Sequence, residues 1–144
     1  MNDYLALKKN QADRLDLFTK DNMFFAFSKQ QLEEGMKSLG VTDTSQLSSI
    51  PGGGIILKDK VAEYKELGTA FSDEMQKAID SDTTGEGFIY NMFLYELDNH
   101  EYSYTGELDQ TLDALDLTLE AVNASQPLLN GLNLAIKKQR QMYA

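Results

Sequence analysis

The stretch FIYNMFLYEL, residues 88–97, would carry apolar side chains around most of its circumference as a helix. A helix with so broad an apolar face lies at the centre of a core, or shares a second face with another chain. The segment therefore predicts a central helix, and it leaves open a homodimer formed through residues 88–97. The residues at helical spacing are Phe88, Ile89, Met92, Phe93 and Leu97, and those that widen the face are Tyr90, Leu94 and Tyr95.

Helical spacing of apolar residues also predicts helices on both sides of this stretch. Ser28 with Gln31 matches a capping box that starts one of them. Pro127, two residues after Ser125, is typical of the first turn of another. Thr118 begins a further turn or two. The main predicted helices cover residues 4–19, 28–39, 59–80, 88–97 and 108–115, with a last helix that opens at residue 125.

Two short apolar segments predict a small sheet. MFFAF, residues 23–27, has three phenylalanines in four positions, which is typical of a buried strand. We expect it to pair with a second strand at residues 54–58, and the helix between them excludes a simple hairpin. The glycine run of residues 52–54 lacks the Gly-Lys-Ser/Thr ending of a phosphate-binding loop and leads into a strand. We therefore expect it to supply a turn or bulge and not a nucleotide site.

Together these elements predict an α+β fold that is mostly α. We expect about five to six helices and one small two-stranded β-sheet, with strands near 23–27 and 54–58, in a single domain of residues 1–144. The chain has no cysteine, which excludes disulfides and thiolate chemistry and suits a reducing cytosol. No apolar run reaches membrane-spanning length. These observations predict a cytoplasmic protein without a membrane contact.

Negative charge is concentrated in the second half of the chain. The formal net charge is −10, and residues 78–136 contain eleven carboxylates and no Lys or Arg. Binding to a phosphate backbone depends on basic side chains that neutralise phosphates. A field of one sign raises the encounter rate with partners of opposite charge. This half therefore predicts a basic protein partner, or a surface that serves only solubility, and it excludes direct nucleic-acid binding.

The only histidine of the chain, His100, has two carboxylates beside it. With one His and no Cys, the chain lacks the ligand set of a structural zinc site, and no calcium-loop pattern is present, so we expect no metal and no cofactor. An imidazole titrates near neutral pH, which suits proton transfer. A small enzyme that uses His100 with Glu101 or Asp98 as acid and base is therefore the second hypothesis. The alternative for His100 is a partly exposed side chain at a helix end, hydrogen-bonded to a nearby group.

A row of carboxylates follows this histidine. Its members are spaced i, i+4, i+7 and i+11, so on one helix they would share a face, and like charges at i, i+4 cost stability. The row is a solvated face, or a docking surface for a basic partner with tyrosines as aromatic anchors. The first hypothesis is a non-catalytic interaction protein that binds through residues 96–120. The predicted partner-binding residues are Asp109, Asp113, Asp116, Glu120, Tyr102 and Tyr104.

Three segments of the chain carry a resemblance to a known family. They are FFAFSKQQLEEG, GGGIILK and MFLYELDNHEYSYTGELDQTLDALDLT. Over residues 22–136 the chain resembles a family of small uncharacterised proteins encoded by phages, plasmids and conjugative elements of Gram-positive bacteria. The most specific part is residues 95–118, where Asp116 stands at a position at which the family pattern AL-x-LT has glycine.

The resemblance assigns no activity and no site residue. It implies a protein of a mobile element that acts in the cytoplasm of the host cell. In that setting, a small acidic protein is expected to inhibit a basic host protein that handles nucleic acid, as anti-CRISPR and antirestriction proteins do. A self-associating accessory protein without a ligand is the remaining hypothesis.

Overall fold

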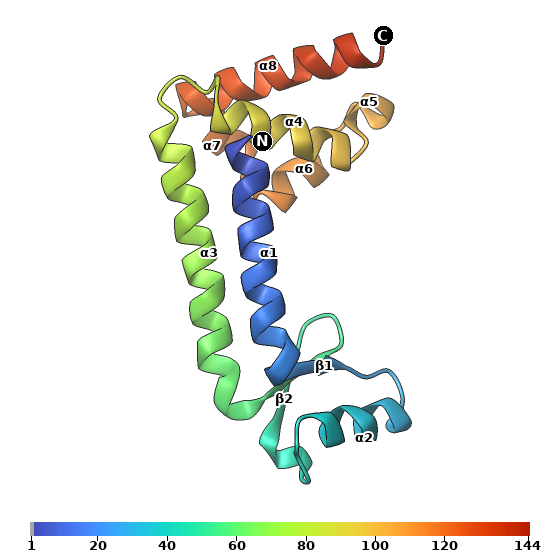
Figure 1. Cartoon of the computed structure of the whole chain (residues 1–144). Coiled ribbons are helices and arrows are strands. Elements are labelled where there is room, and N and C mark those ends of the chain that lie inside the picture. Colours follow the sequence, from blue (N-terminus) through green and yellow to red (C-terminus); the bar gives the residue numbers. More distant parts are fainter. Residues whose placement is uncertain (1) are drawn as a thin grey trace. The chain divides into compact units, whose positions relative to one another are not determined.

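The computed structural model describes residues 2–144 and divides them into two compact units. Unit 1 combines the described residues up to Lys8 with Glu74–Ala144, and unit 2 is Lys9–Asp73. Helices α1 and α3 each contribute residues to both units (Figure 1). The expectation of one domain over residues 1–144 stays a prediction, and each unit is described by itself below.

The expected class, a mostly helical α+β fold, is confirmed, but the predicted numbers of elements were wrong. Residues 2–144 form eight α-helices where five to six were expected, and three strands where two were expected. The helices are α1 (Asp3–Asn22), α2 (Lys29–Ser38), α3 (Val61–Ser81), α4 (Phe88–Asn99), α5 (Tyr102–Thr105), α6 (Asp109–Ala114), α7 (Leu119–Asn123) and α8 (Gln126–Met142). The strands are β1 (Met23–Phe25), β2 (Leu47–Ile50) and β3 (Gly54–Leu57), and short 3-10 turns cover Thr44–Gln46 and Lys58–Lys60.

Unit 2 contains an antiparallel sheet with strand order β1-β3-β2. The predicted pairing of the two apolar runs is confirmed, since Met23 lies opposite Ile56 and Phe25 lies opposite Gly54. Strand β2 lies on the other side of β3, with Ile50 also opposite Gly54. The sequence did not predict β2, because its two serines and the following Pro51 are typical of loops. Its backbone groups are paired through β3, a partner that the local sequence does not show.

The glycines between β2 and β3 have the role that the sequence predicted for them. Gly52 and Gly53 have φ angles of 90° and 86°, a region in which other residues are strained. They turn the chain from β2 into β3. Helix α2 begins as expected, because the Ser28 hydroxyl accepts the Gln31 N–H at 3.1 Å and the Gln31 side chain accepts the Phe27 N–H at 2.7 Å.

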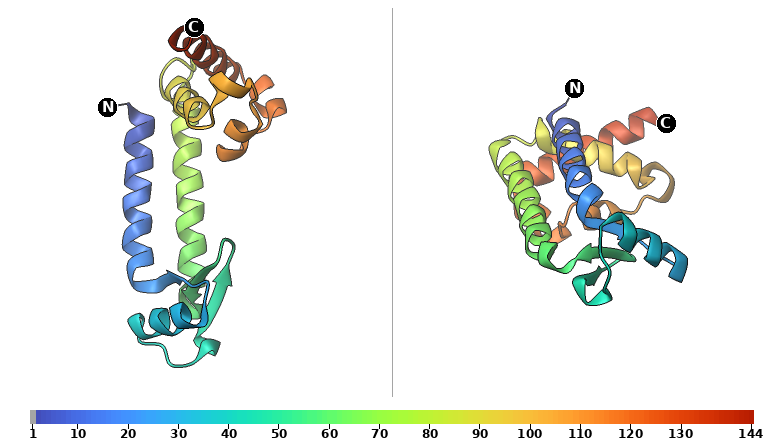
Figure 2. Two further views of the ribbon diagram at one scale, coloured as in Figure 1. Left: turned by 90° about the vertical axis from the view of Figure 1, so that its right-hand side faces the viewer. Right: turned by 60° about the horizontal axis from the view of Figure 1, so that its bottom comes forward.

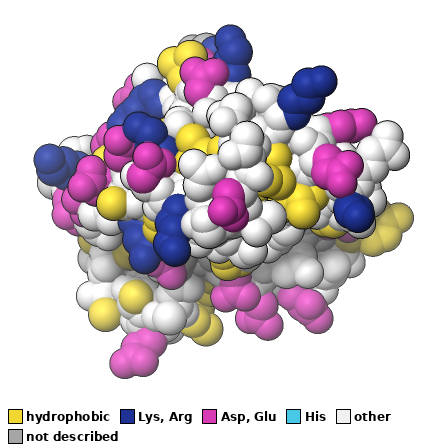
Figure 3. Space-filling view, turned by 90° about the horizontal axis from the view of Figure 1, so that it is seen from below, with side chains coloured by type: hydrophobic (Ala, Val, Ile, Leu, Met, Phe, Trp, Pro, Cys, Tyr) yellow, Lys and Arg dark blue, Asp and Glu magenta, His cyan; other side chains and the backbone are white. Residues whose placement is uncertain are grey.

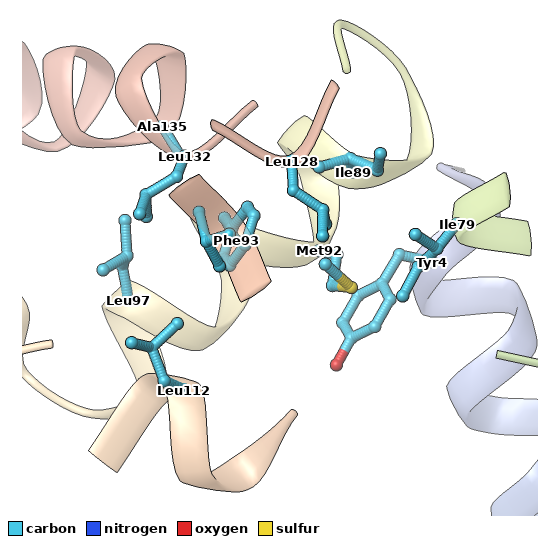
Figure 4. Packing of buried hydrophobic residues seen from close by; sticks show 11 residues of the cluster. Tyr4, Ile79, Ile89, Met92, Phe93, Leu97, Leu112, Leu128, Leu132 and Ala135 are labelled. Carbon is cyan, nitrogen blue, oxygen red and sulfur yellow. The ribbon is translucent and has the colours of Figure 1, made fainter. Parts of the chain in front are cut away.

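The main hydrophobic core lies in unit 1 and is built around α4, as the opening stretch of sequence predicts. Four apolar side chains of α4 are fully buried, and they pack against α8, α6, α7 and the first turn of α1. Figure 4 shows Phe93 and Leu97 beside Leu132, and Met92 beside Tyr4. The central position of this helix accounts for its broad apolar face. A homodimer through residues 88–97 stays a prediction.

Helices α4 and α8 approach each other closely where two glycines meet. A Cβ atom on Gly131 would lie 2.5 Å from the Ile89 side chain, and one on Gly85 would lie 2.0 Å from the Pro127 carbonyl oxygen. Neither glycine leaves room for a larger residue unless the helices separate. This contact fixes the beginning of α4 against the beginning of α8 (Figure 2).

Gln139 is the polar exception on the buried face of α8. Its side chain is 1% exposed, and neither amide atom has a hydrogen-bond partner among residues 2–144. A buried polar group without a partner costs about 1–3 kcal/mol. We expect Gln139→Leu, which keeps a similar volume, to raise the free energy of unfolding by about 1–2 kcal/mol in urea titrations.

The matched control for this prediction is Gln141→Leu on the exposed side of the same helix. Exposed substitutions of this kind change stability by no more than about 0.5 kcal/mol. A loss of stability in the Gln139 variant would show that the buried amide is satisfied by bound water, and would contradict the prediction.

Candidate functional site

The predicted partner-binding carboxylates Asp109, Asp113, Asp116 and Glu120, together with Glu101 and Glu107, lie between the end of α4 and α7 in unit 1, and we call these six residues the α5–α7 face. All six are exposed. Asp109 and Asp113 are on α6, Asp116 is in the turn after it, and Glu120 is on α7. These residues are therefore not on one helix, although they remain close in sequence. Within residues 2–144, none of the six forms an ion pair.

The turn at Asp116 interrupts the row. Asp116 has a φ of 54°, the left-handed region that favours glycine. A glycine was expected at this position from the sequence, and the tight turn forms with the aspartate. Asn and Asp tolerate this conformation better than other side chains do. The residue with the unfavourable backbone conformation, Asp116, is thus exposed and adds its charge to the α5–α7 face.

The two candidate aromatic anchors differ in exposure. Tyr104 is 92% exposed, whereas Tyr102 is half-buried and packs against the core of unit 1. Only Tyr104 therefore offers its whole ring to a partner. Tyr102 instead connects α5 to the core.

Helix α6 is attached to α4 by a buried hydrogen bond and by apolar packing. The Thr111 hydroxyl, which is fully buried, donates to the backbone carbonyl of Glu96 at 3.3 Å. Leu112 lies next to it in the core. The next helix starts independently, since the Thr118 hydroxyl accepts the Ala121 N–H at 3.1 Å. These contacts connect the helices that carry the acidic residues to the core of unit 1.

The structure does not bring the three candidate catalytic groups together. His100 is the C-cap of α4, and its Nε2 is enclosed 3.7 Å from a carboxylate oxygen of Glu96. Asp98 is exposed and accepts a hydrogen bond from the Tyr143 hydroxyl, which raises the pKa of Tyr143. Glu101 is exposed and has a φ of 58°. An acid–base role for His100 stays a prediction.

Sequence reasoning missed the most unusual carboxylate of the region, Glu96. It is 2% exposed in the middle of the core helix, and its carboxylate receives the Lys8 Nζ at 3.2 Å. The Lys8 ammonium also lies 5.2 Å from the ring centroid of Tyr95 and 5.6 Å from that of Tyr4. We call Tyr4, Lys8, Tyr95, Glu96 and His100 the Glu96 cluster. It neutralises a buried charge within unit 1 and holds the first turns of α1 on α4.

The negative charge of Glu96 affects the pKa of Tyr4. Its pKa is raised, first by burial and then by the charge of Glu96 and a hydrogen bond with that carboxylate. The phenol therefore stays protonated and donates. The signal in the sequence is the combination of a carboxylate within an apolar helix and a lysine on a helix 88 residues away. The carboxylate can be recognised in the sequence, but its pairing with the lysine can be recognised only in the folded structure.

Asp82 also has a role that the sequence did not reveal. Its carboxylate accepts backbone N–H groups from Gly85 at 2.9 Å, Ile89 at 3.0 Å and Gly87 at 3.1 Å. Burial raises the pKa of Asp82, but these donors together outweigh it and lower the pKa below its ordinary value. Asp82 thus orders residues 83–87 and caps the start of α4. Two of the eleven carboxylates in residues 78–136, Asp82 and Glu96, are therefore structural.

Metal binding was not expected from the sequence. Within residues 2–144, no three side chains of His, Asp or Glu are grouped in a way that could hold a metal ion. Over the same residues, no helix has the length and apolar character needed to cross a membrane. Neither finding assigns a function.

The fold and the exposed carboxylates define a small, mostly helical α+β protein with an acidic face. Residues 4–138 match the model of a family of unknown function, DUF7659, and the chain belongs to this family. The match covers more of the chain than residues 22–136, over which the resemblance was drawn. No curated protein and no solved structure matches the chain.

Proposed function

We propose that this chain is a non-catalytic interaction protein whose α5–α7 face binds a basic protein. The observation that carries the proposal is the set of six exposed carboxylates, which have no Lys or Arg among residues 78–136 to neutralise them. Complementary charge raises association rates and suppresses wrong partners. The acidic face would thus select a partner by its positive surface.

Tyr104 supports the proposal because a fully exposed aromatic ring next to these carboxylates matches the composition of binding hot spots. The carboxylates alone supply mainly encounter rate and specificity, whereas a buried ring supplies affinity. The expected contact is therefore a tyrosine inserted into an apolar pocket of the partner, surrounded by acid–base pairs.

The proposal extends to the biological setting. We propose that the chain comes from a phage or another mobile element and acts in the host cytoplasm. Its partner would be a basic host protein that handles nucleic acid, inhibited in the manner of anti-CRISPR or antirestriction proteins. Support comes from the acidic face, which can occupy a groove built to hold phosphates. Direct binding of nucleic acid by this face is not part of the proposal.

The test is capture of binding proteins from a host lysate by the wild-type chain and by Asp109→Lys, Asp113→Lys. We expect the wild type to retain a basic protein at low salt and to lose it as ionic strength rises, because exposed charges are screened. We expect the double variant to retain none. Both proteins are compared by circular dichroism and urea titration to confirm that their helix content and stability are similar.

The matched control is Glu33→Lys, Glu34→Lys, which makes the same change of net charge on exposed residues of α2. Retention of the partner by this control shows that location and not total charge matters. Equal capture by wild type and the Asp109, Asp113 variant would contradict the proposal and return the face to a solubility role.

A further inference from the structure

The C-terminal half of α8 carries the only basic residues of the chain after Lys77. They are Lys137, Lys138 and Arg140. All three are exposed, and within residues 2–144 none of them forms an ion pair. Cations near the end of a helix are stabilised by the helix dipole, which accounts for part of their placement. Their charge is also free to meet a carboxylate from another molecule.

A hollow of about 400 Å³ lies between the first turns of α4 and this half of α8. Tyr90 of α4 and Leu134 of α8, both half-buried, give it an apolar part. A second hollow of about 520 Å³ along α8 shares Lys137 with the first and includes Arg140. We call the residues of the first hollow the α8 hollow: Glu86, Tyr90, Leu134, Lys137, Lys138 and Gln141.

Helix α5, in the same unit, presents a side chain that matches the α8 hollow. Tyr104 is 92% exposed, and Glu101 and Glu107 stand three residues before and after it. Both carboxylates are exposed, and within residues 2–144 neither forms an ion pair. An aromatic ring combines apolar area with a polar tip, so it suits a hollow that is partly apolar and partly charged. The two surfaces are therefore complementary in charge and in character.

We propose that the α8 hollow binds α5 of a second copy of this chain, in a dimer with a two-fold axis. In each contact the Tyr104 ring occupies the hollow, and its flanking carboxylates lie against Lys137 and Lys138. Helices α5 and α8 contact each other within unit 1, so the two surfaces are neighbours on one molecule (Figure 1). A two-fold axis then forms the same contact twice, as in other symmetric dimers.

Charge complementarity selects this occupant. The three unpaired cations of α8 need a surface of opposite sign, and the α5–α7 face supplies six unpaired carboxylates on every copy. Unit 2 offers no such surface, since it contains eight basic and ten acidic residues. Figure 3, seen from below, shows basic and acidic side chains mixed with hydrophobic ones on that face.

The net charge of −10 does not prevent this association. At physiological ionic strength, exposed charges more than about 8 Å apart are largely screened from each other. Repulsion between distant carboxylates of the two copies is therefore weak, whereas the charges that meet in the contact still attract. The sign of the contact thus matters more than the sign of the whole chain.

The inference deepens the proposed function and rests on it, because both use the α5–α7 face. A dimer covers Tyr104 in each copy and part of the acidic face. The basic host protein would then have to displace the second copy before it binds. Self-association would in this way regulate access to the face.

The test is the mass of the full chain in sedimentation equilibrium over a range of concentrations, at physiological ionic strength. The first variant is Lys137→Glu, Lys138→Glu, and the second is Glu101→Lys, Glu107→Lys. We expect the wild type to form dimers. Each variant places like charges together in both contacts, and we expect each to raise the dimer Kd at least about tenfold. Circular dichroism and urea titration check that both variants stay folded.

A mixture of the two variants tests the identity of the partner. In a mixed dimer, the unchanged α8 hollow of the second variant meets the unchanged α5 of the first. The other contact has both signs reversed, so it is complementary again. We expect the 1:1 mixture to dimerise with a Kd in the wild-type range, although each variant alone does not. Only a second copy that uses these two surfaces predicts this recovery.

Two further comparisons separate location and ring from total charge. Lys29→Glu, Lys65→Glu makes the same change of net charge on exposed residues of unit 2, and we expect its dimer Kd to match that of wild type. Tyr104→Ser removes the ring without a change of charge, and we expect the Kd to rise at least about tenfold. Tyr104→Phe keeps the ring and is expected to dimerise like wild type.

Three results would overturn the inference. The first is a wild-type chain that stays monomeric at every concentration, including one whose α8 hollow binds an oligoglutamate peptide. The second is a dimer that persists in the folded Lys137→Glu, Lys138→Glu variant. The third is a mixture of the two variants that dimerises no better than either variant alone.

Failure of this inference can be told from failure of the proposed function. The Lys137→Glu, Lys138→Glu variant keeps every carboxylate of the α5–α7 face, so we expect it to retain the host protein while it is monomeric. A monomeric wild type that still captures a basic protein would contradict the self-association alone. A wild type that dimerises, but captures no more than Asp109→Lys, Asp113→Lys, would support the self-association and contradict the proposed function.

Discussion

Replacing Lys8 by methionine is expected to lower the free energy of unfolding by about 2–3 kcal/mol. Methionine keeps most of the aliphatic stem and removes the charge. Glu96 would then be a carboxylate buried to 2% exposure that has lost its ammonium partner, 3.2 Å away in the wild type. Removing one member of a fully buried pair costs about 3–5 kcal/mol, and we expect a smaller loss here because the Lys8 side chain is 41% exposed.

Substitution of the other member of the pair, Glu96, is expected to lower the free energy of unfolding by a smaller amount. Glu96→Gln removes the buried charge and leaves Lys8 partly in water, where its ammonium stays solvated, so we expect a loss of about 1 kcal/mol. The double variant Lys8→Met, Glu96→Gln has no unpaired charge and should be close in stability to Glu96→Gln alone. Urea titration of the four proteins gives the coupling free energy of the pair.

The control for this cycle is Lys9→Met. Lys9 also pairs with a carboxylate, that of Asp13 at 2.8 Å, but both side chains are well exposed. We expect no measurable shift of its unfolding midpoint. If Lys8→Met costs no more than Glu96→Gln, or if the two changes are additive, Lys8 does not neutralise Glu96 and the account of the cluster is wrong.

The second large effect is expected at Asp82. Asp82→Ala removes the acceptor for three backbone N–H groups and leaves residues 83–87 and the first turn of α4 without their cap. Loss of such a cap costs about 0.5–2 kcal/mol, and we expect the upper end because one carboxylate serves three donors. The neighbouring Asp80→Ala, which loses only a hydrogen bond from Gln76, is the control.

The Asp82 interaction also predicts a pH dependence. The folded state lowers the pKa of Asp82, so its contribution is fully present above the ordinary aspartate pKa of about 4. The contribution is lost as the pH falls through the lower pKa of the folded state. We expect the difference in free energy of unfolding between wild type and Asp82→Asn to become smaller as the pH falls below about 4. A difference that stays constant down to the acid transition would contradict the assignment.

The sequence predicted the parts of this fold that depend on local pattern. The apolar spacing in residues 88–97 indicated a core helix, and Ser28 and Gln31 indicated where α2 begins. Strand β2 was missed because its two serines are favourable only when β3 lies beside them. Helix α5 was missed because it is four residues long and is separated from α4 by the positive φ of Glu101.

For the candidate site, too, the sequence predicted only the features that depend on local pattern. The exposed carboxylates were predicted from charge and spacing alone, because an exposed side chain does not depend on a contact with a distant residue. The structural roles of Glu96 and Asp82 were not found, because in sequence they are two acidic residues among eleven. What distinguishes Glu96 is Lys8, which lies 88 positions earlier in the chain, and no periodic signal in the sequence connects the two.

The composition of unit 1 has a consequence for the order of events during synthesis. Its residues up to Lys8 are synthesised before unit 2, and the residues that they contact on α4 and α8 are synthesised after unit 2. At a translation rate of about 5–20 residues per second, Glu96 is synthesised several seconds after Tyr4 and Lys8. Contacts of such wide sequence separation slow folding. Residues 9–73 are thus complete in the nascent chain while the larger core is still unfinished.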